Sequence, residues 1–238
     1  MIPLVILCGG KATRLHPLTN FYAKSMLPFW GKPFLQYQIE LFVQFGFKTF
    51  YLATGHKKEQ IQNFCENYGN KDITLTMVPD KPPLNLADTV LRIANSCNSD
   101  FALTYGDSFF CSDLSKPLAA FQADSSSASL MTVIPAKMAV EHNPNANISD
   151  SDGKVIEYSK STVNEFSFIN YGFIILRRAH VLKYLNDNSD LDLMLSSLAA
   201  DGKLRAYSEQ IKFMEVGSFS GLAEFAEYSA KNFEVLSE

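Results

Sequence analysis

The sequence is poor in cysteine and in long apolar runs, and both absences exclude classes of protein. Its four cysteines, at positions 8, 65, 97 and 111, show no CxxC spacing and lie in apolar or helical stretches. A cysteine-based zinc site is therefore not expected, and small buried thiols are the better interpretation. Nothing in this cysteine usage requires an oxidising compartment, so we expect a cytoplasmic protein.

No apolar run approaches the roughly 20 residues that a membrane-spanning helix needs. The first eight residues are apolar, but no basic region precedes them and no small-residue cleavage site follows. We therefore interpret them as a buried strand and not as a signal peptide. No membrane partner is predicted.

The chain also lacks a basic excess, because its net charge is −4. A dedicated nucleic-acid binder usually carries an excess of lysine and arginine, so no nucleic-acid partner is predicted. If phosphates are bound, a few placed cations and backbone N–H groups must bind them. No linker rich in Gly, Ser or Pro divides the 238 residues, of which 47% are hydrophobic, and we predict a single domain over residues 1–238.

The first half of the sequence alternates strand-like apolar runs with segments of helical periodicity. Strands are expected at 2–8, 49–53, 73–78 and 101–105, and helices at 33–45, 58–68 and 88–94. Such alternation predicts an α/β fold with a Rossmann-like mixed, mainly parallel sheet flanked by helices. In these sheets, ligands bind at the carboxyl ends of the strands.

The second half has a different pattern. Strands are expected at 129–134, 154–158 and 168–176, and helices near 179–185, 190–200 and 220–236. Asp152-Gly153 is a turn signal. Residues 143–152 are polar and rich in turn formers, so an exposed loop is predicted there.

The strongest chemical signal is a glycine loop directly after the first strand. Residues 7–19 read LCGGKATRLHPLT, and residues 23–28 read AKSMLP. Glycines let backbone N–H groups approach a phosphate closely. Arg14 can bind phosphate oxygens in a bidentate manner, and Lys24 supplies a mobile charge. Neither G-x-G-x-x-G nor G-x-x-x-x-G-K-[ST] is present, so dinucleotide-binding and P-loop motifs have no local support.

This segment resembles the N-terminal signature of the sugar-1-phosphate nucleotidyltransferases, G-G-x-G-[ST]-R-L-x-P-L-T followed by P-K-x-x-x-P. The matching positions are Arg14, Leu15, Pro17, Leu18, Thr19, Lys24 and Pro28. The resemblance implies that Arg14 and Lys24 are catalytic and activate the phosphates of a nucleoside triphosphate. It also implies a triphosphate-binding loop made of Leu7, Gly9, Gly10 and Thr13.

Two residues depart from the signature. Ala12 stands where the family usually has glycine, and Ala23 replaces the proline before the lysine. A methyl group at position 12 restricts backbone conformations with positive φ, so the loop is expected to differ somewhat in shape.

Residues 83–90, PLNLADTV, resemble the P-L-G-T-A-x-A-[VI] stretch that contacts base and sugar in family members. The resemblance makes Pro83, Asn85 and Asp88 nucleotide-binding candidates. Asn85 and Leu86 replace the usual Gly-Thr, so base selectivity does not carry over from any subfamily. A helix start capped by Asn85 is an equally good interpretation.

Two carboxylates match the metal-binding positions of the family. Asp107 follows the strand 101–105 in the sequence Tyr-Gly-Asp, where a carboxylate is well placed to hold Mg²⁺ on phosphate oxygens. Glu215 stands in Met-Glu-Val-Gly-Ser, where relatives have D-[IV]-G-[ST]. The resemblance therefore implies Mg²⁺ as cofactor, held by Asp107 and Glu215, with Gly106 among the substrate-binding residues.

The sugar phosphate is expected to meet residues of the second half. Lys160 follows a stretch, VIEYSK, that resembles V-x-x-F-x-E-K, and Asn170 precedes Tyr171-Gly172 as in a frequent N-x-G. An exposed lysine and a strand-entry asparagine are the alternative interpretations. On this view residues 1–125 bind the nucleotide and residues 126–238 bind the sugar phosphate.

The resemblance thus predicts a metal-dependent enzyme that joins a nucleoside triphosphate to a sugar 1-phosphate and releases pyrophosphate. GTP or CTP are the favoured triphosphates, because short relatives include heptose-1-phosphate guanylyltransferases and hexose cytidylyltransferases. Three alternatives remain: transfer to a non-sugar phosphate such as phosphocholine, a metal-dependent glycosyltransferase using Asp150-Ser151-Asp152, and a non-catalytic nucleotide-binding relative. The sequence leaves the oligomeric state open.

Overall fold

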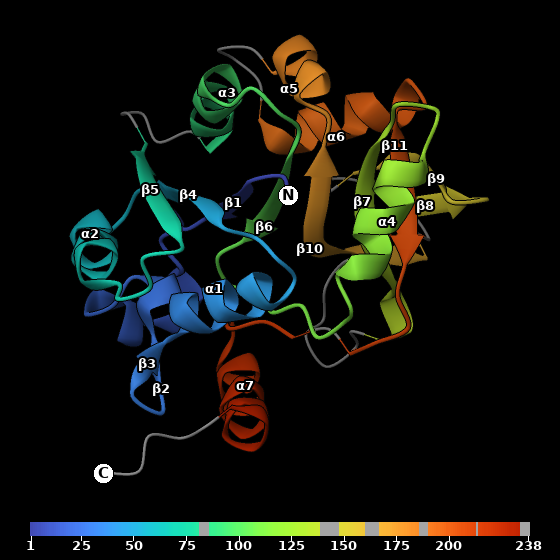
Figure 1. Ribbon diagram of the computed structural model, residues 1–238. Helices are drawn as coiled ribbons and strands as arrows, with labels where there is room; N and C mark the ends of the chain where they lie inside the picture. Colours follow the sequence, from blue (N-terminus) through green and yellow to red (C-terminus); the bar gives the residue numbers. More distant parts are fainter. Residues whose placement is uncertain (81–85, 139–147, 160–166, 186–189, 213, 234–238) are drawn as a thin grey trace.

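The computed structural model describes residues 1–80, 86–138, 148–159, 167–185, 190–212 and 214–233, and these are built around a nine-stranded mixed β-sheet (Figure 1). The strands of this sheet are β1 (Leu4–Leu7), β4 (Thr49–Thr54), β5 (Thr74–Pro79), β6 (Phe101–Tyr105), β7 (Ser129–Pro135), β8 (Ile148–Ser151), β9 (Lys154–Tyr158), β10 (Phe168–Leu176) and β11 (Leu204–Ser208). A separate hairpin consists of β2 (Pro28–Phe29) and β3 (Lys32–Pro33).

Apart from α7, the α-helices of the described residues lie on both faces of the sheet. The α-helices are α1 (Phe34–Gln44), α2 (Lys58–Asn67), α3 (Leu86–Ser96), α4 (Ser115–Ala123), α5 (Arg178–Tyr184), α6 (Leu191–Ala200) and α7 (Phe219–Asn232). Three short 3₁₀ helices, η1 (Thr13–Leu15), η2 (Leu18–Asn20) and η3 (Lys24–Met26), follow β1.

The strand order is β5-β4-β1-β6-β10-β7-β11-β9-β8. The first four strands are parallel, and β10 then runs antiparallel to both β6 and β7. The four parallel strands therefore present their carboxyl ends at one edge of the sheet. The predicted α/β fold with a mixed sheet is confirmed.

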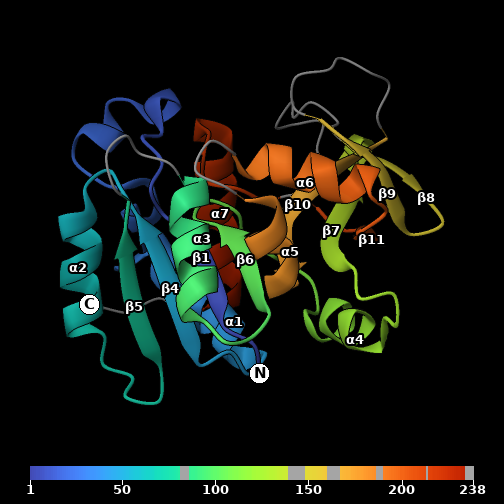
Figure 2. The ribbon, with the colours of Figure 1, turned by 90° about the horizontal axis from the view of Figure 1, so that it is seen from above.

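Strand β1 shows why the N-terminal run is apolar throughout. Alternate residues of a strand face opposite sides of the sheet. Val5 and Leu7 join the core beneath α3, α5 and α6, whereas Leu4 and Ile6 join the core beneath α1, α2 and α4. Seen from above, α3, α5 and α6 cover one face of the sheet (Figure 2). A strand buried on both faces has no position for a polar side chain.

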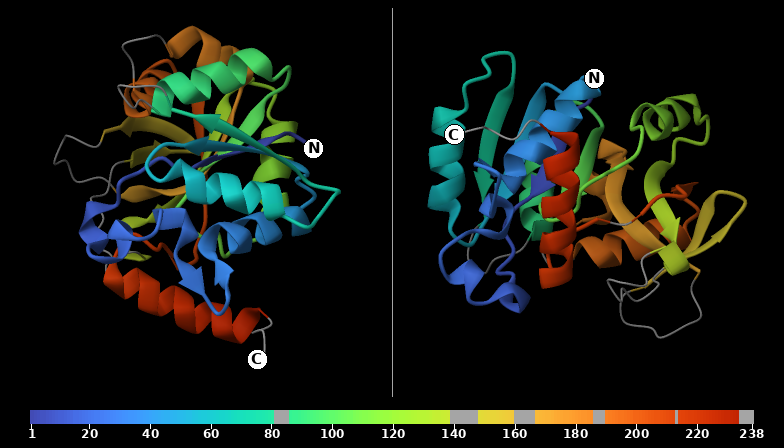
Figure 3. Two further views of the ribbon diagram at one scale, coloured as in Figure 1. Left: turned by 90° about the vertical axis from the view of Figure 1, so that its left-hand side faces the viewer. Right: turned by 90° about the horizontal axis from the view of Figure 1, so that it is seen from below.

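Helix α7 lies against the segment that follows β1, although the two are far apart in sequence (Figure 3). Phe225, on α7, is fully buried, and its ring lies 4.8 Å from the rings of both Phe29 and Phe34. The indole N–H of Trp30 donates to the carbonyl oxygen of Ala226 at 2.9 Å. This aromatic cluster joins the C-terminal helix to the hairpin that follows the signature loop.

The expected helices and strands of the first half are present, with boundaries shifted by one or two residues. The hairpin, α4 and β11 were not predicted from the sequence. One prediction was wrong: residues 148–151, placed in an exposed loop, form strand β8, in which Ile148 is buried. The segment is polar, but it forms a hairpin with β9 through the turn at Asp152-Gly153, and its first residue, Ile148, also pairs with Phe168 of β10.

Among the described residues, no helix combines the length and the apolar character that spanning a bilayer would require.

Truncating Phe225 tests whether α7 depends on the aromatic cluster. Phe225→Ala removes a buried ring, and we expect a loss of about 3–5 kcal/mol in the free energy of unfolding. Phe219, on the same helix, is 55% exposed, and Phe219→Ala should change that free energy by no more than about 0.5 kcal/mol. Urea denaturation followed by circular dichroism measures both free energies. Equal losses in the two variants would show that α7 does not depend on the aromatic cluster.

Candidate active site

The glycine loop leaves β1 at the carboxyl edge of the sheet. The N–H of Cys8 still donates to Ala53 at 2.7 Å, continuing the pairing with β4. Ala12 then adopts a left-handed conformation with φ 48° and ψ 48°, despite its methyl group. Its carbonyl oxygen accepts from the N–H of Leu15 at 3.0 Å and from the hydroxyl of Thr19 at 3.1 Å. The loop thus keeps a conformation typical of glycine at the position where the sequence departs from the signature.

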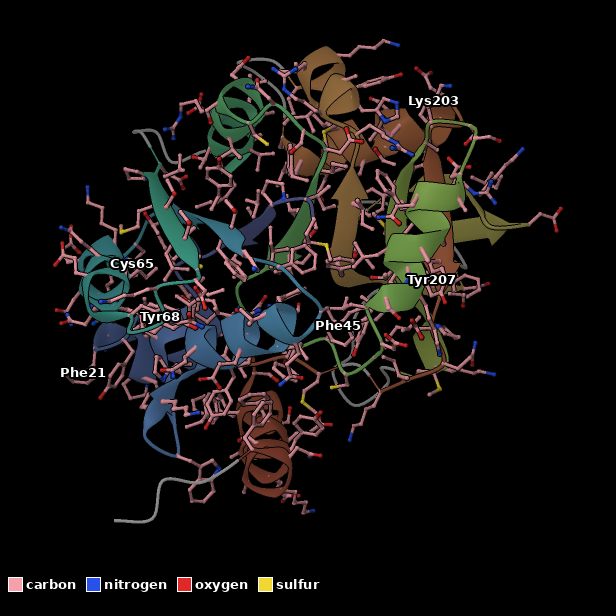
Figure 4. The ribbon with its side chains drawn as sticks, viewed as in Figure 1. Phe21, Phe45, Cys65, Tyr68, Lys203 and Tyr207 are labelled. Atoms are coloured by element: carbon pink, nitrogen blue, oxygen red, sulfur yellow. The ribbon has the colours of Figure 1, made fainter. Side chains whose placement is uncertain are left out.

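Helix α2 positions the segment that leads to Lys24. The amide side chain of Gln60 accepts from the N–H of Ala23 at 2.8 Å and donates to the carbonyl oxygen of Phe21 at 2.6 Å. Phe21 itself is 70% exposed and lies at the margin of the molecule (Figure 4). The backbone just before Lys24 is therefore fixed by one side chain from another element.

A tight turn after β6 carries Asp107. The N–H of Gly106 donates to Leu7 at 3.0 Å, and a Cβ at position 106 would lie only 2.6 Å from that same carbonyl oxygen. Only glycine fits this close approach of β6 to β1. The buried side chain of Gln38, from α1, donates to the carbonyl oxygens of Tyr105 and Ser108 at 2.9 and 2.7 Å, which holds the turn on both sides.

Glu215 comes to the same place through backbone pairing with this turn. The N–H of Val216 donates to Asp107 at 2.8 Å, and Ser108 forms a bridge with Glu215. The Glu215 carboxylate accepts from the N–H of Gly217 and from the hydroxyl of Ser218. These bonds aim the longer side chain, which replaces the aspartate of the family pattern, at the Asp107 turn.

Lys24, Asp107 and Glu215 converge at Gly217. The Lys24 ammonium forms an ion pair with the Asp107 carboxylate, and the two side chains are 17% and 27% exposed. A Cβ at position 217 would contact Glu215 Oε2 and would lie 2.9 Å from Lys24 Nζ and 3.2 Å from Asp107 Oδ2. A cation thus lies beside two carboxylates, in partial shelter from water, next to the glycine loop.

These two carboxylates suit a magnesium ion. Mg²⁺ is usually bound by one or two carboxylates, with substrate phosphates and water completing its six ligands. No cluster of three or more His, Cys, Asp or Glu side chains in the described part of the chain could hold a metal alone. The pair therefore fits an ion that arrives with a phosphate ligand, and not an ion enclosed by protein.

A cavity of about 160 Å³ opens beside the ion pair. Its lining consists of Leu7, Cys8, Gly10, Lys24, Ser25, Leu86, Tyr105, Gly106 and Asp107. Burial raises the pKa of the Cys8 thiol to about 12. The thiol is therefore protonated at neutral pH.

Other site residues predicted from the sequence are not part of the described cavity lining. Thr13 and Arg14 are exposed on the loop, and neither belongs to the described lining of the cavity. Asp88, in the first turn of α3, forms an ion pair with Arg92 at 3.0 Å. Asn170 accepts from the N–H of Gly172 at 2.8 Å and donates to the Tyr105 hydroxyl at 3.3 Å, which links β10 to the site.

Three candidates, Pro83, Asn85 and Lys160, lie outside the described residues. Conversely, Gln38, Gln60 and Gly217 were not predicted from the sequence. Only Gly217 carried a signal, because it belongs to the motif that contains Glu215. The two glutamines lie on helices far from the motifs, so no local pattern marks them.

A larger groove of about 640 Å³ lies elsewhere, between α1 and the end of α2 that carries Tyr68 (Figure 4). Its carboxylate, Glu40, is bound by Lys32 at 3.2 Å and by Gln36 at 2.8 Å. The groove contains no counterpart of the converging carboxylates. The smaller cavity is therefore the candidate active site.

A family model described as "Nucleotidyl transferase" matches residues 4–156, which is more than half of the chain. The chain therefore belongs to the nucleotidyl transferase family. The matched residues contain β1, the whole glycine loop and Asp107.

Curated relatives include enzymes named for sugar phosphates. The chain is 25% identical over 244 residues to a probable glucose-1-phosphate cytidylyltransferase of Bacillus subtilis, covering 92% of this chain and 93% of that protein. It is 31% identical over 112 residues to a D-glycero-alpha-D-manno-heptose 1-phosphate guanylyltransferase of Campylobacter jejuni, covering 47% of this chain and 50% of the relative. A match of 36% to the bifunctional protein GlmU of Methanococcus vannielii covers 46% of this chain and only 25% of that protein.

Solved structures share the fold at low sequence identity. A putative glucose-1-phosphate thymidylyltransferase from Bacillus anthracis superposes with a TM-score of 0.84 at 16% identity, covering 98% of this chain and 97% of that chain. HddC from Yersinia pseudotuberculosis, complexed with GMP-PN, gives a TM-score of 0.80 at 21% identity, covering 96% and 99%. The expected type of fold is confirmed.

The two alanines that depart from the signature should respond in opposite ways to glycine. Ala12 has φ 48°, so Ala12→Gly relieves a left-handed conformation and should raise the free energy of unfolding by up to about 1 kcal/mol. Ala23 is buried with φ −61°, so Ala23→Gly should lower that free energy by about 0.5–1 kcal/mol. Thermal and urea unfolding show whether the free energy of unfolding rises in Ala12→Gly and falls in Ala23→Gly. A loss of stability in Ala12→Gly would show that the backbone at Ala12 is not strained.

Proposed function

We propose that this chain is a magnesium-dependent nucleotidyltransferase that joins a nucleoside triphosphate, GTP or CTP, to a sugar 1-phosphate. The products are a nucleotide sugar and pyrophosphate. In this proposal residues 1–238 act as a single domain, in which residues 1–125 bind the nucleotide and residues 126–238, with Lys160 and Asn170, bind the sugar phosphate.

One observation carries the proposal. The Lys24–Asp107 ion pair lies beside Glu215 at the edge where β1 and β6 end, next to the loop of Gly9 and Gly10. The triphosphate and the sugar 1-phosphate are both anions and repel each other. They can come together only where positive charge and N–H groups offset this repulsion. Two carboxylates beside the single Lys24 ammonium leave an excess of negative charge, and a bound magnesium ion would offset it.

In the proposed reaction, a phosphate oxygen of the sugar 1-phosphate attacks the α-phosphorus of the triphosphate. A new P–O bond forms, the bond between the α-phosphorus and the oxygen bridging to the β-phosphorus breaks, and pyrophosphate leaves. The attacking oxygen is already anionic at neutral pH, so no general base is needed. Lys24, Arg14 and the loop N–H groups position and neutralise the phosphates, and catalysis rests on these two effects.

Incubation with Mg²⁺, each triphosphate in turn and a mixture of sugar 1-phosphates tests this function. Pyrophosphate release together with a nucleotide sugar found by mass spectrometry is expected. Phosphocholine in place of the sugar phosphates tests transfer to a non-sugar acceptor. Triphosphate binding without pyrophosphate release under every condition would contradict an enzyme and favour a non-catalytic relative.

Removing either member of the ion pair should abolish turnover. Because charge neutralisation is the main source of rate, Lys24→Ala and Asp107→Ala should each lower kcat at least about 100-fold. Both side chains are partly exposed, so the folded state should persist, as circular dichroism can verify.

Lys203→Ala is the matched control, because this exposed lysine lies at the opposite side of the molecule from α2 (Figure 4). It should leave kcat within about twofold of the parent. Near-normal rates in both Lys24→Ala and Asp107→Ala would overturn the assignment of the site.

A further inference from the structure

The groove of about 640 Å³ between α1 and α2 is separate from the candidate active site, and the proposed reaction gives it no role. One wall is the side of α1 that carries Gln36 and Glu40, which are four residues apart and therefore share one face of the helix. The other wall is the second half of α2 together with residues 68–70, and Tyr68 marks this place in Figure 4. Small-molecule sites usually measure about 300–1,000 Å³, so the groove has the size of a ligand site.

The charges of the groove favour a neutral ligand. Glu40 is the charged side chain of the described lining, and its carboxylate is already bound by Lys32 at 3.2 Å and by Gln36 at 2.8 Å. No lysine, arginine or histidine belongs to that described lining. Phosphate groups bind where cations or clustered backbone N–H groups face them. The groove therefore does not suit a nucleotide or a sugar phosphate.

Amide side chains give the groove its polar chemistry. They are Gln36, Asn63, Asn67 and Asn70. Asn67 donates to the carbonyl oxygen of Asn63 at 2.8 Å, and Asn70 accepts from the N–H of Asp72 at 3.0 Å. Within the described part of the chain, no acceptor pairs with the side-chain NH₂ groups of Asn63 and Asn70, and both residues are exposed. A hydroxyl group both donates and accepts, as an amide does, so the lining is complementary to a ligand with several hydroxyl groups.

Two aromatic rings supply the apolar part of the same lining. Phe64 and Tyr68 are both half-buried, and their ring centroids are 5.3 Å apart. The face of an aromatic ring is negative and attracts the weakly positive C–H groups on one face of a sugar ring. Burial, and after it the charge of Glu40, raises the pKa of Tyr68 above its ordinary value, so its hydroxyl is a donor at neutral pH.

We propose that this groove binds a neutral saccharide, with the amides on its hydroxyl groups and the rings of Phe64 and Tyr68 against its C–H face. The proposal goes beyond the proposed function, because the described linings of the groove and of the cavity beside Lys24 share no residue. A peptide fits less well. Both walls are helical and offer no strand edge, and the amides interrupt the apolar surface that an amphipathic helix would need.

The test titrates the full chain with glucose, N-acetylglucosamine, maltose and cellobiose and follows its backbone amide signals by ¹H–¹⁵N NMR. At least one of these sugars should shift the signals of residues 63–70 and of Met26, which borders the groove, to a plateau that gives a dissociation constant. Glucose 6-phosphate should bind there more weakly than glucose, because the groove offers a carboxylate and no described cation of its own lining.

Two variants locate the bound sugar. Asn63→Ala removes one amide, and alanine is well tolerated in a helix, so the fold should persist. Affinity for the sugar should fall about fivefold, as expected for one lost hydrogen bond. Tyr68→Phe keeps the ring but removes the hydroxyl, and a loss of similar size is expected. Gln62→Ala is the matched control, because this exposed amide on the same helix is not part of the described lining, and it should leave the affinity unchanged.

The inference is overturned if no sugar saturates these signals, or if Asn63→Ala and Tyr68→Phe both bind the sugar as the parent does. An equal loss of affinity in Gln62→Ala would overturn it too. Signals that move with protein concentration and not with sugar would instead make the groove an interface between copies of this chain. None of these results touches nucleotidyl transfer, because Asn63→Ala should release pyrophosphate at the rate of the parent.

Discussion

The ion pair between Lys24 and Asp107 joins residues 83 positions apart in the chain, and much of the structure holds these two side chains together. Neither residue lies in a strand: Lys24 is in a short 3₁₀ helix and Asp107 in the turn after β6. Such segments have little intrinsic rigidity. Their geometry therefore depends on the parallel pairing of β1 with β6, which brings the two strand ends to one edge.

Two glutamines also help to position the loops that carry Lys24 and Asp107. Gln38 reaches from α1 to the Asp107 turn, and Gln60 reaches from α2 to the segment before Lys24. Each side-chain amide bonds to two backbone groups, and these lie at or just beyond the ends of short helices or strands. Because buried backbone groups need hydrogen-bond partners, these amides give irregular chain a defined course. Helices α1 and α2, which cover the sheet, thus also position the loops of the candidate active site.

Different strands of the sheet carry different residues of the site. The parallel strands β5, β4, β1 and β6 end at an edge that carries Asp80, Gly55, Gly9 and Asp107 in spatial order. β10 runs antiparallel to β6, and Asn170 from this strand reaches the Tyr105 hydroxyl. At Gly106 glycine is required because the backbone of β1 comes too close for a Cβ. A left-handed conformation also favours glycine, but Ala12 adopts one with hydrogen bonds from Leu15 and Thr19 to its carbonyl oxygen.

The sequence by itself determined the alternating strands and helices of the first half, because apolar periodicity is a local property and β1 is buried on both faces. It also marked Lys24, Asp107 and Glu215, since their motifs are contiguous. Only the tertiary structure decided that these three side chains converge at Gly217, that Ile148 pairs with Phe168 of β10, and that Gln38 and Gln60 bond to the loops of the site. Those relations depend on strand order and on contacts between distant segments, and no short stretch of sequence records which strand lies beside which.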